Sequence, residues 1–127
     1  MAPIRVLLVD DSLPFLNSTA RILADESCVC IVGQYLSGQQ ALAEIASRDC
    51  DLVLVDFAMP GMNGLEVARR IKALPMPPRV ILLSLHDADG YREAAQSCTD
   101  AYLQKQHAAS QLLPLIRSLF AVPKLQH

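Results

Sequence analysis

The stretch that decides the fold is "IRVLLVDDS", residues Ile4 to Ser12, an aliphatic run that ends in two adjacent carboxylates. A continuous apolar run, with no alternation of apolar and polar positions, is typical of a strand buried on both faces of a parallel sheet. Asp10 and Asp11 follow directly where this strand is expected to end. Two like charges beside a hydrophobic core repel each other, so the arrangement requires a compensating partner.

Further along the chain, apolar runs alternate with amphipathic segments. The predicted strands are Ile4–Val9, Val29–Tyr35, Leu52–Val55, Val80–Leu85 and Ala101–Leu103. The predicted helices begin after Ser12, at Ser37 or Gly38, and at Asn63 or Gly64, and the last two span about Asp87 to Ser97 and about Ala108 to Phe120. This alternation predicts an α/β, doubly wound domain with a five-stranded parallel sheet flanked by five helices.

Two helical patterns carry specific expectations. In the first, Leu13, Leu16, Ala20 and Leu23 fall on one apolar stripe, and Ser12 is the expected cap. In the last, Pro114 falls inside the pattern, where it has no N–H for the helix. The sequence therefore predicts either a kink at Pro114 or a later start of that helix, and it leaves both open.

Composition limits the classes of function. The chain has 127 residues, 52% of them hydrophobic, which is enough for one domain with a sizeable core. A formal net charge of −2 argues against direct nucleic-acid binding by this segment, because phosphate contacts need clustered Lys and Arg. No apolar run approaches the roughly 20 residues that span a membrane. With no signal-peptide pattern, the expected compartment is the cytoplasm. We expect the domain to occupy residues 1–121, with 122–127 as a tail or the start of a linker.

Residues capable of chemistry follow four of the five predicted strands. In open α/β sheets, ligands bind beyond the carboxyl ends of the strands. A polar residue after one strand is usually a helix cap or a turn former. Here, however, acids, a hydroxyl and an amine gather at one edge, namely Asp10, Asp11, Asp56, Ser84 and Lys105.

Such a cluster of carboxylates favours a metal site. Two unit charges about 4 Å apart repel by roughly 4 kcal/mol at an effective dielectric constant near 20. A divalent cation reverses this repulsion, and oxygen ligands with room for water suit Mg²⁺. Together with Lys105 and the Ser84 hydroxyl, these are the parts that stabilise a phosphoryl group in transfer. A carboxylate can serve as the nucleophile.

With these residues in place, the chain resembles the receiver domain of bacterial two-component response regulators. The resemblance runs from about Ile4 to Phe120 and rests on "VLLVDDS", "DLVLVDFAMPGMNGLEVARRI", "RVILLSLHD" and "DAYLQK" in this order. The central motif is most similar to the subgroup in which a helix-turn-helix DNA-binding domain follows the receiver. The expected fold is then flavodoxin-like, with strand order 2-1-3-4-5.

The resemblance implies a role for each site residue. Asp56 would accept a phosphoryl group from a histidine kinase or a phosphotransfer protein. Asp10, Asp11, Asp56 and the backbone carbonyl of Ala58 would bind Mg²⁺, and Lys105 would pair with the phosphoryl oxygens. The resemblance thus implies a signalling domain rather than an enzyme, because such a domain catalyses only its own phosphorylation and dephosphorylation.

The resemblance also implies a switch. Ser84 would reach toward the phosphoryl group and Tyr102 would turn inward, which remodels the face formed by the fourth helix, fifth strand and fifth helix. That face would contact an output domain or a partner protein, and the family allows a homodimer. The output is expected to be transcription through a DNA-binding domain that this chain does not contain, and the alternative is a stand-alone receiver that acts by protein contact.

Three other interpretations fit the residues less well. A Mg²⁺-dependent phosphatase of the haloacid dehalogenase kind needs a second Asp two residues after the nucleophile, and Ala58 stands there. A flavin or dinucleotide site needs a glycine-rich phosphate loop after the first strand, where this chain has acids. A receiver-like module that takes no phosphate would not need the full set of polar residues.

Overall fold

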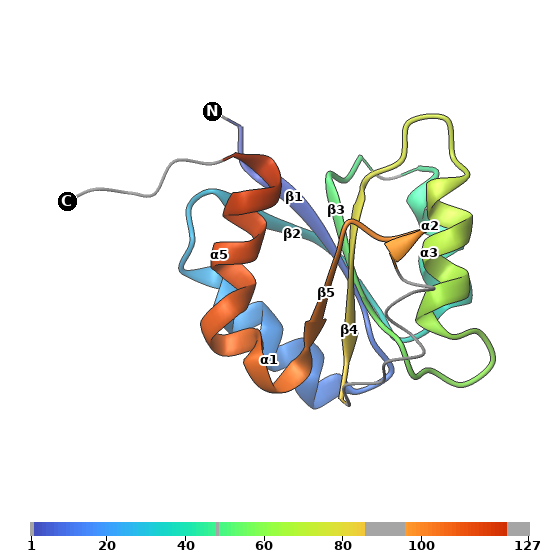
Figure 1. Cartoon of the computed structure of the whole chain (residues 1–127), viewed down its shortest axis with the longest axis horizontal. Coiled ribbons are helices and arrows are strands. Elements are labelled where there is room, and N and C mark those ends of the chain that lie inside the picture. The colour runs from blue at the N-terminus through green and yellow to red at the C-terminus, as the bar shows by residue number, and fades with distance from the viewer. Residues whose placement is uncertain (1, 48, 86–95, 122–127) are drawn as a thin grey trace.

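The computed structural model describes residues 2–47, 49–85 and 96–121. Its strands form one parallel sheet in the order β2-β1-β3-β4-β5, which confirms the expected fold class and strand order (Figure 1). The strands are β1 (Ile4–Val9), β2 (Val29–Tyr35), β3 (Leu52–Asp56), β4 (Arg79–Ser84) and β5 (Ala101–Gln104). The helices are α1 (Leu13–Ala24), α2 (Gly38–Ile45), α3 (Gly64–Lys72) and α5 (Ala108–Phe120), with a short 3-10 turn η1 (Lys105–His107). The helix expected over about 87–97 falls mostly on 86–95, outside the described residues.

Helices cover both faces of the sheet, which explains the continuous aliphatic strands. In Figure 1, α1 and α5 lie on one face, and α2 and α3 lie on the other. Leu7 and Val9 of β1 pack in the cluster that includes residues of α2 and α3, and Val6 and Leu8 pack in the cluster that includes residues of α1 and α5. All five residues of β3 are buried. A strand buried on both faces has no polar side, as the sequence predicted.

Each of the first three helices begins just after the carboxyl end of a strand, and each has a side-chain cap. The Oγ of Ser12 accepts a hydrogen bond from Phe15 N at 3.3 Å, and the Oγ of Ser37 accepts one from Gln40 N at 3.2 Å. The Oδ1 of Asn63 accepts one from Glu66 N at 3.0 Å. These caps resolve the open boundaries, because α2 begins at Gly38 and α3 at Gly64.

Two expectations about helices are corrected. On α1 the expected Leu16 and Leu23 are buried, but Leu13, the first residue of the helix, is 55% exposed and Ala20 is half-buried, and Thr19 joins the buried stripe. The later start of α5 is wrong, since this helix begins at Ala108 and continues through Pro114. Leu112 and Ile116 are fully buried on either side of Pro114, so packing on the sheet supports the helix where the proline removes a hydrogen bond.

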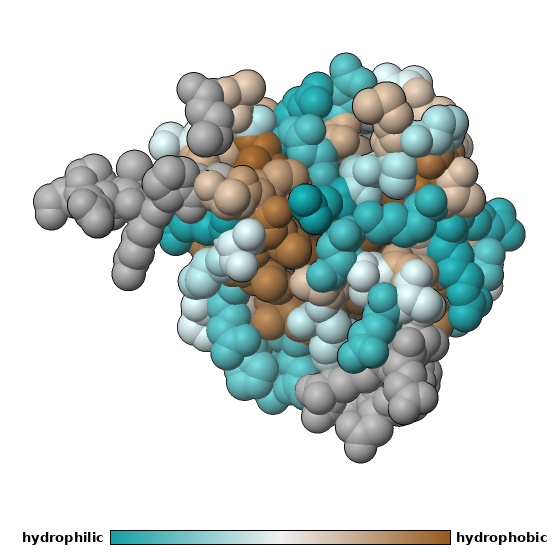
Figure 2. Space-filling model, turned by 45° about the horizontal axis from the view of Figure 1, so that its top comes forward, coloured by the Kyte–Doolittle hydropathy of each residue, from teal (hydrophilic) through white to brown (hydrophobic). Residues whose placement is uncertain are grey.

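Ion pairs join the elements at the amino ends of the strands, which are turned toward the viewer in Figure 2 and carry both hydrophilic and hydrophobic surface. The Arg5 guanidinium donates to both carboxylate oxygens of Asp51, at 3.1 and 3.0 Å, and links β1 to the start of β3. These hydrogen bonds hold the pKa of Asp51 below its usual value. Arg117 of α5 donates to Glu26 at 2.6 Å. None of the described helices is both long enough and apolar enough to cross a bilayer.

Candidate functional site

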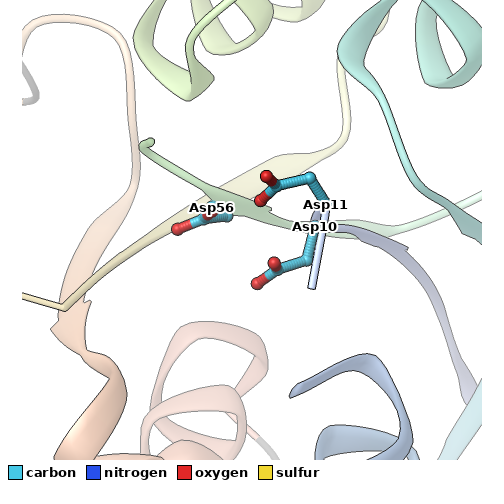
Figure 3. A group of neighbouring side chains, drawn as sticks. All are labelled: Asp10, Asp11 and Asp56. Atoms are coloured by element: carbon cyan, nitrogen blue, oxygen red, sulfur yellow. The ribbon is translucent and has the colours of Figure 1, made fainter. Parts of the chain in front are cut away.

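The acids predicted from the sequence meet at the carboxyl edge of the sheet. Val9 and Val55 are partners in the parallel pairing of β1 and β3, so Asp10 and Asp56 follow side by side. One carboxylate oxygen from each of Asp10, Asp11 and Asp56 lies within 4.8 Å of the others (Figure 3). Asp10 and Asp56 are only 2% and 4% exposed, whereas Asp11 is exposed. The site is therefore a buried pair of acids with a third acid open to solvent.

The first turn of α3 rests directly on the backbone of Asp56. Gly64 N donates a hydrogen bond to Phe57 O at 2.8 Å, and Phe57 N donates to Leu83 O of β4 at 2.7 Å. A Cβ added at Gly64 would lie 2.2 Å from the backbone oxygen of Asp56, closer than any side chain can approach. Gly64 is thus required by the contact that fixes the backbone of Asp56.

We expect Gly64→Ala to destabilise the domain by about 1–3 kcal/mol, the usual range for overpacking, because backbone must move to admit the methyl group. Urea unfolding measures this change. The matched control is Gly33→Ala, where the added Cβ meets only the Tyr35 ring, a side chain that can shift. A loss no larger at Gly64 than at Gly33 would show that the contact with Asp56 is not restrictive.

A buried lysine lies among the acids. The Nζ of Lys105, in η1 directly after β5, is 2.7 Å from Asp10 Oδ2 and 3.3 Å from Asp56 Oδ1, and its side chain is 7% exposed. The other oxygen of Asp10 accepts a hydrogen bond from Ser12 N at 2.8 Å. Lys105 thus joins the ends of β1, β3 and β5. The ammonium pairs with Asp10 and Asp56, and the third carboxylate, Asp11, lies beside them, so three acids and one lysine leave this group of described residues negative.

The excess negative charge of the cluster changes the pKa of Asp56. Burial and the neighbouring charge of Asp10 raise the pKa of Asp56 to about 6, although Lys105 acts in the opposite direction. Because the pKa in the folded state lies above the ordinary value, ionised Asp56 favours unfolding. This carboxyl contributes most to stability when it is protonated, and that contribution is lost as the pH rises through about 6.

Asp56→Asn is therefore expected to stabilise the metal-free domain at pH 8. The gain should be about 1–3 kcal/mol, since a pKa two units above the ordinary value corresponds to at most about 3 kcal/mol. At pH 4 the gain should be much smaller, because Asp56 is then mostly protonated in the folded state. Urea unfolding with a chelator present measures both values. If Asp56→Asn is no more stable than the wild type at pH 8, the claim that ionised Asp56 destabilises the folded domain is wrong.

The donor set fits a hard divalent cation. Three carboxylates provide oxygen ligands close enough to share one ion, and the exposed Asp11 leaves a path for entry and room for water. The cation would neutralise the excess negative charge that Lys105 leaves uncompensated. Asp10, Asp11 and Asp56 are thus the side chains that could hold it.

Comparison with known proteins agrees with this geometry. A family model described as the response regulator receiver domain matches residues 6–117. The chain belongs to this family. Its members are signalling domains of two-component systems, so the chain is the receiver domain of a response regulator.

Curated relatives of this receiver domain are response regulators. The response regulator UvrY of Escherichia coli is 32% identical over 119 residues, which cover 93% of this chain and 55% of UvrY. The probable transcriptional regulatory protein NarL of Mycobacterium tuberculosis is 31% identical over 114 residues, 89% of this chain and 53% of that protein. This chain thus spans about half the length of these relatives.

A solved receiver shares the fold. The signal receiver domain of the putative response regulator NarL from Mycobacterium tuberculosis has a TM-score of 0.87 at 28% identity, covering 97% of this chain and all of that one. The phosphatase and nucleotide-binding interpretations are set aside by this family membership.

The remaining predicted residues of the receiver domain lie around the acids. Ser84 is buried at the end of β4, next to β3 in the sheet, and so lies at the same edge as Asp56. Tyr102 pairs with Leu82 in the register of β4 and β5, and it packs on the cluster that includes residues of α2 and α3. Ala58 is exposed in the loop after β3.

One residue of the site was missed in the sequence. The ring of Phe15, in the first turn of α1, lies beneath the Lys105 ammonium, with 4.3 Å between Nζ and the ring centroid. Helical spacing assigned the apolar stripe of α1 without Phe15. The only sequence signal is an aromatic residue one helical turn after the acid pair.

Proposed function

We propose that this chain is the phosphoacceptor domain of a response regulator, with Asp56 as the acceptor. A histidine kinase or a phosphotransfer protein would supply the phosphoryl group in a Mg²⁺-dependent reaction. One observation carries the proposal: Asp56 is a buried carboxylate that shares one cluster with two other acids and has the Lys105 ammonium 3.3 Å away. This combination suits a nucleophile that must approach a phosphoryl group of the same charge.

The proposed reaction is a transfer between two nucleophiles. A carboxylate oxygen of Asp56 attacks phosphorus, the new O–P bond forms an acyl phosphate, and the bond from phosphorus to the donor nitrogen or oxygen breaks with its electron pair. The Lys105 ammonium pairs with the phosphoryl oxygens as their charge shifts. Asp10, Asp11, Asp56 and the carbonyl of Ala58 would hold Mg²⁺, which would supply further positive charge at those oxygens.

The proposed switch uses Ser84 and Tyr102. The position of Ser84, buried at the end of the strand next to β3, supports a contact between its hydroxyl and a phosphoryl group on Asp56. Tyr102 would turn inward as Ser84 moves, and the surface around β5 and α5 would change. A phosphoryl group that favours one arrangement of these residues shifts the population toward it.

The proposed output is transcription. One relative is named a transcriptional regulatory protein and another a nitrate/nitrite response regulator protein, and each is about twice as long as the matched segment. We infer that residues 1–121 act as the receiver unit, with 122–127 leading toward an output region of this kind. A stand-alone receiver that acts by protein contact, or a homodimer, is the alternative partner arrangement.

Asp56 is expected to be the labelled residue when the protein is incubated with acetyl phosphate and Mg²⁺. Intact mass spectrometry should show the added mass of one phosphoryl group on the wild type and none on Asp56→Asn. Asp51→Asn is the matched control, because it removes an Asp at the opposite edge of the sheet. Undiminished labelling of Asp56→Asn would assign the acceptor to another residue.

Asp11→Ala is expected to weaken Mg²⁺ binding more than about tenfold, because it removes an oxygen ligand from a small donor set. Isothermal titration of the unphosphorylated protein measures the affinity. Asp25→Ala removes an exposed acid at the end of α1 and should leave the affinity unchanged. Equal affinities for the two variants would refute the proposed coordination.

A further inference from the structure

The contact between Phe15 and Lys105 belongs to a closed set of interactions around Asp10. Asp10 Oδ1 accepts from Ser12 N at 2.8 Å, and Ser12 Oγ accepts from Phe15 N at 3.3 Å. The Phe15 ring lies 4.3 Å from Lys105 Nζ, and Lys105 returns to Asp10 Oδ2 at 2.7 Å. Pro14 restricts the backbone of the same first turn. Asp10 thus orients the first turn of α1 that carries the Phe15 ring, and it also pairs with the Lys105 ammonium that the ring faces.

The three N–H groups of the Lys105 ammonium need partners, because the side chain is almost fully buried. The ammonium forms ion pairs with Asp10 and Asp56, with N···O distances of 2.7 and 3.3 Å, although Asp10 Oδ2 accepts no hydrogen bond within the described residues. The negative face of an aromatic ring attracts a cation within about 6 Å of its centroid. The Phe15 ring can therefore face the remaining side of the ammonium without water, which an aliphatic side chain cannot do.

We propose that Phe15 is a positioning residue of the phosphoryl site. The face of its ring shields the Lys105 ammonium from water and orients it toward the oxygens of Asp56. The proposal rests on the phosphoacceptor function proposed above. When a phosphoryl group is attached to Asp56, the Lys105 ammonium contacts the phosphoryl oxygens in place of the Asp56 carboxylate. Its contact with the Phe15 ring does not change. Phe15 acts on the reaction through Lys105 and does not touch the phosphoryl group.

The Phe15 ring and Asp10 both border a small cavity. A cavity of about 10 Å³ lies beside Phe15 and is lined in part by Asp10 and Thr19. Thr19 Oγ1 is buried and makes no hydrogen bond within the described residues. Removal of the ring would enlarge this cavity toward the charged pair. Water that entered there would hydrate Lys105 and Asp10 and weaken their field at Asp56.

The first experiment replaces the ring while keeping apolar bulk. Phe15→Leu should lower the rate constant of phosphorylation by acetyl phosphate, at saturating Mg²⁺, by roughly three- to thirtyfold, the range of cation–π contacts from exposed to desolvated sites. Phe15→Tyr keeps the ring face and should retain most of the rate. The matched control for packing is Ile22→Ala, two helical turns further along α1 against the same core cluster, and it should leave the rate unchanged.

The second experiment separates the ring's electrostatics from its shape. Phenylalanine analogues with one, two and three ring fluorines at position 15 weaken the negative ring face while changing its volume little. The logarithm of the rate constant should fall steadily with each fluorine. A double-mutant cycle completes the test, because Phe15→Leu should cause no further loss in a Lys105→Met background if Phe15 acts through Lys105.

A spectroscopic measurement tests the contact without any reaction. Ring current from Phe15 should shift the Cε protons of Lys105 upfield in the NMR spectrum of the wild type. This shift should disappear in Phe15→Leu and persist in Phe15→Tyr. It is measured on the unphosphorylated protein, so it reports on the positioning even where no phosphoryl group is accepted.

The outcomes separate the two proposals. A wild type that takes no label on Asp56 overturns the phosphoacceptor function, and the NMR shift still decides whether Phe15 holds Lys105. A wild type that is labelled normally, with equal rates across the fluorinated series, overturns the positioning role and leaves the phosphoacceptor function intact. A loss of rate in Phe15→Leu that persists unchanged in the Lys105→Met background also overturns it, because the ring would then act by packing alone.

Discussion

Repulsion among three carboxylates at one edge of a parallel sheet is the constraint on which the site depends. Asp10 and Asp56 are withdrawn from water, so their charges interact strongly. Lys105 pairs with both of them, and Asp11 adds a third carboxylate to the same cluster. The excess negative charge raises the pKa of Asp56 to about 6. The folded chain therefore favours whatever adds positive charge there, a property that suits the proposed phosphoacceptor role of Asp56.

The rest of the fold holds these charges together. Parallel pairing of β1 with β3 puts Asp10 and Asp56 side by side, and the first turn of α3 closes on the backbone of Asp56 because Gly64 has no side chain. At the other end of the strands, Arg5 and Asp51 form a favourable pair. Stabilising ion pairs thus lie at the amino edge, and the unfavourable cluster lies at the carboxyl edge, held by a core buried on both faces.

Much of this could be predicted from the sequence, because aliphatic strands and strand-end polar residues follow local rules. β1 and β2 have the predicted bounds, and the acid cluster follows from the parallel order alone. The errors arose where tertiary contacts decide. Leu13 fits the helical stripe but is exposed at the first position of α1, and Pro114 is tolerated because α5 is buried on both sides of it. The contact of Phe15 with Lys105 joins segments 90 residues apart, and no local pattern indicates it.

The geometry also implies that cation binding and the position of Lys105 are coupled. The Nζ of Lys105 is nearer to Asp10, at 2.7 Å, than to Asp56, at 3.3 Å. When Asp10 shares its charge with a cation, its attraction for Lys105 weakens, while the attraction of the Phe15 ring does not change. The ammonium then becomes available to oxygens at Asp56 without leaving its support. Two ligands that both interact with Lys105 and Asp10 would influence each other's affinity, so the acid pair and the lysine are energetically coupled.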